Sequence, residues 1–168
     1  MPGMRERTLV LDSCSKTYAM TGWCVGWVAG PAAVVGNIPK LQENVCSCVP
    51  AFVQHGAVCA LRTARADVER MNAEYRARRD TVVAGINAIP SLSARIPEGA
   101  FYLFANNCET GIRAGEFARR LLDEAHVALS PGSAFGQSDQ GYVRISYASS
   151  IDVLEKGIQR IAAFVARG

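Results

Sequence analysis

The chain has 168 residues, which by the usual size of protein domains is enough for one domain or slightly more. Hydrophobic residues make up 49% of it and charged residues 20%, which argues against wholesale disorder. Eighteen Lys and Arg against fifteen Asp and Glu leave a net charge of +3, too small and too evenly interleaved with acids to indicate a nucleic-acid-binding protein.

Two further features bear on the compartment. The cysteines are Cys14, Cys24, Cys46, Cys48, Cys59 and Cys108. We interpret them as reduced thiols, because a chain of this size and apolar content needs no disulfides and we find no secretory leader. This indicates the cytoplasm. Residues 17–39 carry no charge, but Gly30 and Pro31 interrupt the stretch, so it predicts strand, turn and helix of a buried soluble core rather than a membrane span.

Two strands and two helices are predicted in the first part of the chain. Residues 8–12 are an apolar, β-branched run typical of a buried strand, and the small residues 13–16 follow as a loop. Residues 25–29 predict a second strand. Pro31 suits the first turn of a helix that reaches Gln42, and the apolar residues 50–61 predict a buried helix.

A long amphipathic helix is predicted from residue 66 to residue 89. Apolar residues recur there at steps of three and four, namely Val68, Met71, Tyr75, Val82, Ile86 and Ile89. Arginines on the other positions alternate with acids, which is typical of a solvated face and not of a nucleic-acid stripe.

A smaller alternating unit is predicted beyond Pro90. Its expected strands are residues 93–96, 101–104, 126–129 and 142–147, and its expected helices are residues 114–124 and 151–166. Ser149 and Asp152 resemble a capping box at the start of the last helix. The predicted fold class is α/β, in two parts that the long helix joins.

Lys16 is the only charged residue between Asp12 and Lys40. In apolar, small-residue surroundings, desolvation destabilises an ammonium and exposes the amine as a nucleophile, as Schiff-base chemistry requires. From the residues alone, the alternative is that Lys16 extends its ammonium into solvent at the end of a strand.

Five stretches of sequence, in order along the chain, resemble the class I/II aminotransferases, enzymes of the aspartate-aminotransferase fold that depend on pyridoxal 5'-phosphate (PLP). They are PGMRERT (2–8), SCSKTYAMTGWCVG (13–26), PEGAFY (97–102), PGSAFG (131–136) and GYVRISYA (141–148). The resemblance implies a partial fold type I protein. Residues 1–61 would be a remnant of the PLP-binding large-domain sheet with the lysine motif, and residues 62–168 the connecting helix and the α/β small domain.

The resemblance also implies roles for individual residues. Lys16 would form a Schiff base with PLP and move the proton between the substrate α-carbon and the cofactor. The Ser13 hydroxyl would bind the cofactor phosphate, and Arg144 would bind the substrate α-carboxylate. Strand alternation separately places Arg144 on the face opposite Val143 and Ile145, where its guanidinium can form a bidentate contact. A surface salt bridge is the alternative for Arg144.

The sequence departs from the family pattern in two ways. Cys24 occupies a cofactor-binding position, eight residues after Lys16, where the family has an arginine that pairs with the phosphate. The loss of a charge-assisted contact costs about 1.5–3 kcal/mol of cofactor affinity. The family's N-terminal half, which carries a glycine-rich loop and the groups that stack on and protonate the pyridine ring, has no counterpart here. We therefore expect the C-terminal part of an aminotransferase.

Three functions remain open. The first is amino-group transfer from an amino acid to a 2-oxo acid, by a homodimer. The second is a cofactor-free, truncated remnant that serves as an interaction or structural module, and the third is one half of a split aminotransferase. No metal site is expected, because Cys46, Cys48, Cys59 and His55 match no zinc-ligand spacing; we interpret the three cysteines as buried thiols. Which amino acid is the substrate is not indicated.

Overall fold

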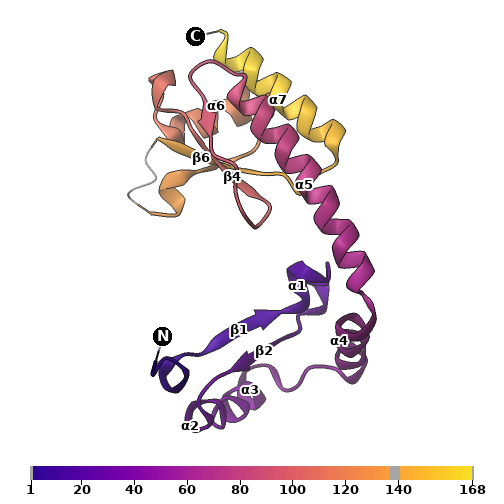
Figure 1. Cartoon of the computed structure of the whole chain (residues 1–168). Helices are drawn as coiled ribbons and strands as arrows, with labels where there is room; N and C mark the ends of the chain where they lie inside the picture. The colour runs from indigo at the N-terminus through magenta and orange to yellow at the C-terminus, as the bar shows by residue number, and fades with distance from the viewer. Residues whose placement is uncertain (1, 137–140, 168) are drawn as a thin grey trace. The chain divides into compact units, whose positions relative to one another are not determined.

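The computed structural model describes residues 2–136 and 141–167. The predicted domains, residues 1–61 and 62–168, include residues 1 and 168, which lie outside these described ranges. The chain divides into two compact units, Met1–Met71 and Asn72–Gly168, and the division falls within the long helix α5 (Arg65–Asn87). Each unit combines helices with an antiparallel sheet, which confirms the α/β fold class (Figure 1). The functional division at residue 61 stays a prediction.

The first unit is built around a two-stranded sheet. Strand β1 (Val10–Ser13) pairs antiparallel with β2 (Gly26–Ala29), so that Val10 lies opposite Ala29 and Ser13 opposite Gly26. Its helices are α1 (Cys14–Thr17), α2 (Ala32–Val35), α3 (Ile38–Cys46) and α4 (Ala51–Thr63), with short 3-10 turns at η1 (Arg5–Arg7) and η2 (Thr21–Trp23). The two predicted strands and the predicted helix at residues 50–61 are confirmed.

Two predictions for this unit are wrong in detail. Residues 14–17 form the helical turn α1 and not a loop, because Ser13 caps the turn by accepting a hydrogen bond from the Ser15 N–H at 3.3 Å. The single helix predicted from Pro31 to Gln42 is two helices, α2 and α3. Pro39 has no N–H and its ring clashes with the carbonyl of the preceding turn, so a new helix begins at Ile38.

The burial predicted for the first unit is also wrong. Leu11 on β1 is 76% exposed and Phe52 on α4 is 70% exposed. Cys46, Cys48 and Cys59, expected to be buried thiols, are exposed as well. The reason is that two strands bury apolar surface only against a further layer, and the described residues of this unit place none over either face of the sheet.

The second unit contains a four-stranded antiparallel sheet in the order β3-β4-β6-β5. The strands are β3 (Ser93–Ala94), β4 (Tyr102–Asn106), β5 (Ser130–Pro131) and β6 (Tyr142–Ser146), and the helices are α5, α6 (Ala114–Ala125) and α7 (Ile151–Val165), with 3-10 turns η3 (Cys108–Thr110) and η4 (Gly132–Ala134). The long helix, both later helices and the strands at β3, β4 and β6 confirm the predicted elements.

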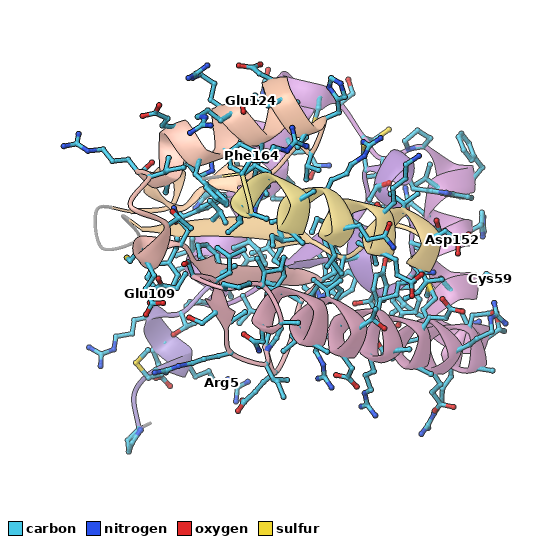
Figure 2. All side chains as sticks on the ribbon, turned by 90° about the horizontal axis from the view of Figure 1, so that it is seen from above. Arg5, Cys59, Glu109, Glu124, Asp152 and Phe164 are labelled. Carbon is cyan, nitrogen blue, oxygen red and sulfur yellow. The ribbon has the colours of Figure 1, made fainter. Side chains whose placement is uncertain are left out.

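The core of this unit lies on one face of the β4–β6 pair. Leu103 and Val143 point into it, and each is 1% exposed. The helices cover that face, and Phe164 of α7 points toward α6, where its ring meets Phe117 edge-on at 5.7 Å (Figure 2). The other main members are Val82 and Ile86 of α5, Leu121 of α6, and Leu154 and Ile161 of α7.

Two predictions for the second unit are wrong. Residues 126–129 are not a strand, because the Val127 N–H donates to the Leu121 carbonyl at 3.0 Å and so caps α6, while His126 adopts the left-handed conformation at φ 56°. The short strand β5 begins only at Ser130. The capping box is absent: Ser150, not Ser149, precedes α7, and its side chain makes no capping bond.

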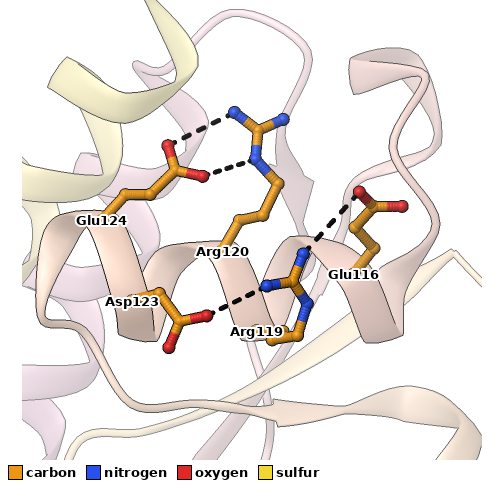
Figure 3. Close-up of polar contacts among 5 residues, drawn as sticks. All are labelled: Glu116, Arg119, Arg120, Asp123 and Glu124. Carbon is orange, nitrogen blue, oxygen red and sulfur yellow. Dashed lines mark hydrogen bonds and ion pairs between the residues drawn. The ribbon is translucent and has the colours of Figure 1, made fainter.

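Ion pairs follow the exposed face of α6 (Figure 3). Arg120 contacts both carboxylate oxygens of Glu124, at 2.7 and 3.3 Å, and Arg119 lies between Glu116 and Asp123. The hydrogen bond from Arg120 holds the pKa of Glu124 below its usual value. These pairs are solvent-exposed, so they support α6 only weakly, and the packing of its apolar face holds it in place.

Replacing Leu121 by Ala is expected to destabilise the second unit by about 2–5 kcal/mol, because its side chain is completely buried and leaves a cavity. The matched control is Leu122→Ala, on the same helix but 51% exposed, which should cost under about 0.5 kcal/mol. Urea unfolding followed by circular dichroism measures both. Equal effects of the two substitutions would contradict the placement of the core.

Tyr147 ties the end of β6 to the chain before β4. Its backbone N–H donates to the Phe101 carbonyl and its hydroxyl to the Ala100 carbonyl, each at 3.0 Å. The side chain is 2% exposed, and burial raises the pKa of Tyr147 above its ordinary value near 10. A raised pKa means that folding favours the neutral phenol. The contribution of the buried Tyr147 phenol to the free energy of unfolding is therefore complete below the ordinary pKa, and it is lost as pH rises through the folded-state pKa.

Between about pH 8 and about pH 11, the free energy of unfolding should accordingly hold its value up to the ordinary tyrosine pKa near 10 and fall above it. Tyr147→Phe should lower the free energy of unfolding by about 1 kcal/mol at the lower pH, because the hydroxyl hydrogen bond is lost. The stability of this variant should then fall less steeply as the pH rises. Urea titrations across this range test it, with Tyr142→Phe as the matched control that keeps the decline. A Tyr147→Phe protein that declines as steeply as the unsubstituted chain would show the prediction to be wrong.

Candidate active site

Lys16 lies in α1, the single helical turn that directly follows β1. Ser13 is its N-cap, in extended backbone conformation at φ −151°, and Cys14 anchors the turn with a completely buried side chain. The Cys14 N–H donates to the Val25 carbonyl at 3.1 Å, which links the turn to the residue before β2. Backbone contacts on both sides therefore hold the turn that carries Lys16.

Ser13 and Lys16 are three residues apart across this turn, so their side chains lie on the same face. The Ser13 hydroxyl is partly buried, and its oxygen accepts the Ser15 N–H. Lys16 is exposed, so the apolar burial that the sequence argument predicted around it is not found. The apolar residues that pack against this turn, Met20 and Ala57 among them, bury Cys14 and leave Lys16 exposed.

Cys24 follows the 3-10 turn η2, which contacts α1. It is exposed and adopts the left-handed conformation at φ 51°, and its thiol donates to the Thr21 carbonyl at 3.8 Å. The preceding Trp23 packs its ring against Gly56 of α4, where a side chain on residue 56 would collide with the ring. The Trp23 ring thus holds the end of η2 against α4, and the Cys24 thiol follows directly after it.

Arg144 lies on β6, directly opposite Phe104 of β4. Its guanidinium carbon is 4.2 Å from the centre of the Tyr102 ring and 4.1 Å from the centre of the Phe135 ring. The side chain is half-buried and makes no hydrogen bond or ion pair with any residue in the described ranges. The surface salt bridge that remained open from the sequence is therefore wrong within those ranges, since no carboxylate partners the arginine.

The predicted site residues are divided between the two units. Ser13, Lys16 and Cys24 lie together around α1 and η2 in the first unit, whereas Arg144 lies on the sheet of the second. Tyr102 and Phe135 were not predicted as site residues. Both fall in stretches that resemble the family, but only the β4–β6 register shows that Tyr102 shares a face with Arg144.

The described parts of the chain contain neither a candidate metal-ligand group nor a candidate membrane-spanning helix. No group of three or more His, Cys, Asp or Glu residues comes together there in a way that could hold an ion. Within the same ranges, no helix is both long enough and apolar enough to cross a bilayer.

Comparison with known proteins decides the family. Residues 2–161 match the family described as aminotransferase class I and II. The chain belongs to this family. Aminotransferases of this family generally use PLP and act on amino acids and keto acids, and they are usually oligomers.

Relatives show which part of the aminotransferase fold is present. The aspartate aminotransferase of Pyrococcus abyssi is 42% identical over 163 residues, which are 96% of this chain and 42% of that protein. An aromatic-amino-acid aminotransferase of Thermococcus litoralis matches with the same identity and coverage. The solved structure of an aromatic aminotransferase from Pyrococcus horikoshii gives a TM-score of 0.95 at 40% identity, covering 99% of this chain and 45% of that one. This aminotransferase chain thus spans 42% of the length of its curated relatives and corresponds to the C-terminal part of their fold.

Proposed function

We propose that this chain supplies the lysine and the carboxylate-binding arginine of a PLP-dependent aminotransferase, which transfers an amino group from an amino acid to a 2-oxo acid. The observation that carries the proposal is Arg144. A guanidinium that lies against two rings, with no carboxylate partner among the described residues, is arranged to bind a carboxylate from outside the chain.

The residues around α1 fit PLP in two respects. The Ser13 oxygen accepts the Ser15 N–H, which leaves the hydroxyl proton of Ser13 for a phosphate oxygen. Lys16 is an exposed residue of the same turn, and its primary amine is the type of nucleophile that condenses with an aldehyde. Cys24 departs from the family because its neutral thiol provides no charge to a phosphate. The fit is therefore to a cofactor that is held more weakly than in the relatives.

PLP, when bound, supplies an aldehyde and an electron-withdrawing ring. In this proposal the Lys16 amine would hold the cofactor at its aldehyde, and once the substrate amine has displaced it, the freed Nζ would accept and return the proton of the substrate α-carbon. The Ser13 hydroxyl holds the phosphate end. Arg144 binds the α-carboxylate and so orients the α-carbon.

The organisation of the complete enzyme is part of the same proposal. Residues 1–61 would belong to the cofactor domain and residues 62–168 to the connecting helix and small domain. The enzyme would be a homodimer, or the remaining part of the fold would be a separate polypeptide that assembles with this chain. Cysteines that form no disulfide among the described residues support a location in the cytoplasm.

A second function is favoured by one observation. Large apolar side chains are exposed on the first unit, among them Leu11, Leu41, Val45 and Phe52. Such a surface supports a cofactor-free module that binds other polypeptides. Size-exclusion chromatography in the presence of PLP separates the two functions. Capture of other chains without bound PLP supports the module, whereas PLP that co-elutes with the chain, as a monomer or as a dimer, contradicts it.

Lys16 is tested by trapping. The chain is incubated with PLP, reduced with borohydride, and digested for peptide mapping by mass spectrometry. We expect the pyridoxyl group on Lys16 and an absorbance that Lys16→Ala abolishes. Lys40→Ala is the matched control, because Lys40 is also exposed but lies on α3, hydrogen-bonded to Asn37. A Lys16→Ala protein that retains the adduct would rule out the assignment.

Cys24 is tested by restoring the charge. Cys24→Arg should lower the dissociation constant for PLP roughly 10- to 100-fold, the value of one charge-assisted contact with a phosphate. Fluorescence titration with PLP measures it. Cys59→Arg, an exposed cysteine on α4, is the control that makes the same change of net charge. If both substitutions tighten binding equally, the gain reflects net charge and position 24 has no contact with the phosphate.

A further inference from the structure

The guanidinium of Arg144 lies against two aromatic rings. Its central carbon lies 4.2 Å from the centroid of the Tyr102 ring and 4.1 Å from that of the Phe135 ring. Both distances are well within the range of cation–π contacts. We call Tyr102 and Phe135 the aromatic clamp.

Two separate segments of the second unit, β4 and the chain after η4, build the clamp. Tyr102 comes from β4 and lies opposite Ser146 in the register, so its side chain shares a sheet face with Arg144. Phe135 follows η4 and is fixed by its N–H, which donates to the Gly132 carbonyl at 2.8 Å. Its ring also meets Phe104 edge-on at 5.7 Å. Backbone pairing and ring packing therefore hold both sides of the clamp.

The clamp restricts what Arg144 can bind. Both rings contact the guanidinium carbon, so they cover part of its surface and leave the N–H groups at its edge for a ligand. No described residue uses those N–H groups for a hydrogen bond or an ion pair. A planar carboxylate fits such an edge with two parallel hydrogen bonds, and holding the plane in advance lowers the entropy lost on binding.

We propose, on the basis of the proposed function, that Tyr102 and Phe135 are positioning residues that fix the plane of the Arg144 guanidinium for in-plane binding of a substrate carboxylate. They act through the arginine and do not themselves bind the carboxylate. Loss of one ring should therefore weaken carboxylate binding while the positive charge stays in place.

The experiment measures binding directly and needs neither PLP nor turnover. The whole chain, labelled with ¹⁵N at arginine, is titrated with pyruvate, a small 2-oxo acid, and the Nε–Hε signal of Arg144 is followed by NMR. Arg144→Gln assigns the signal. Tyr102→Leu and Phe135→Leu should each shift that signal in the free protein and weaken pyruvate binding roughly 2- to 5-fold, the value of one cation–π contact.

Two kinds of control separate positioning from general structure. Tyr102→Phe and Phe135→Tyr keep the rings and should bind pyruvate like the unsubstituted chain. Phe52→Leu removes an exposed ring from the first unit and should change nothing at Arg144. Methyl pyruvate, which lacks the carboxylate, should not move the Arg144 signal. Phe135 is 45% exposed, so its replacement tests the clamp even where Tyr102→Leu fails to fold.

The outcomes distinguish this proposal from the proposed function. Pyruvate binding that is unaffected by Arg144→Gln overturns the role of Arg144 itself and with it the clamp. Binding that Arg144→Gln abolishes but that neither leucine variant weakens overturns the clamp alone. Weaker binding in both leucine variants, restored in both ring-retaining variants, supports the clamp.

Discussion

The antiparallel pairing of β4 with β6 is the constraint on which the second unit depends. Its register places Leu103 and Val143 on the face that the helices cover, and it places Phe104 and Arg144 on the other. A slip of one residue would turn the arginine into the core and expose the valine. The same pairing therefore sets both the stability of this unit and the position of its only predicted site residue.

Arg144 illustrates how a charged side chain is held without a carboxylate partner. The rings of Tyr102 and Phe135 replace part of the lost hydration by cation–π contact, and they leave the N–H edge for a ligand. An ion pair at the same place would have occupied that edge. In the proposed site, two rings beside the arginine would leave that edge for a substrate carboxylate, which a salt bridge would not.

The first unit differs from the second in how much of its apolar surface is buried. Its lysine turn is well defined by the Ser13 cap and by the Cys14–Val25 backbone bond, while the strands around it expose apolar residues on both faces. The chain spans 42% of the length of the two relatives described above. What Lys16 lacks here is an enclosing apolar environment, which other parts of a fold must provide.

Much of the fold could be predicted from the sequence, because its strongest signals are local. Hydrophobic periodicity predicted the long helix and both later helices. Strand alternation predicted β6, with Arg144 and Val143 on opposite faces of the sheet. Predictions failed where a distant or competing contact decided the outcome. The strand expected at residues 126–129 was lost because the Val127 N–H caps α6, and the helix expected from Pro31 was divided at Pro39. Burial in the first unit failed because apolar composition alone does not create a covering layer.

The sequence by itself indicated the family and the order of its motifs. It also predicted roles for Ser13, Lys16 and Arg144 and a missing charge at Cys24, since each of these predictions depends only on residue type and spacing. Only the tertiary structure decided that Arg144 has no carboxylate partner among the described residues and that two rings lie against it. Tyr102 is 42 positions from Arg144 along the chain, and no local pattern records a contact that strand pairing creates.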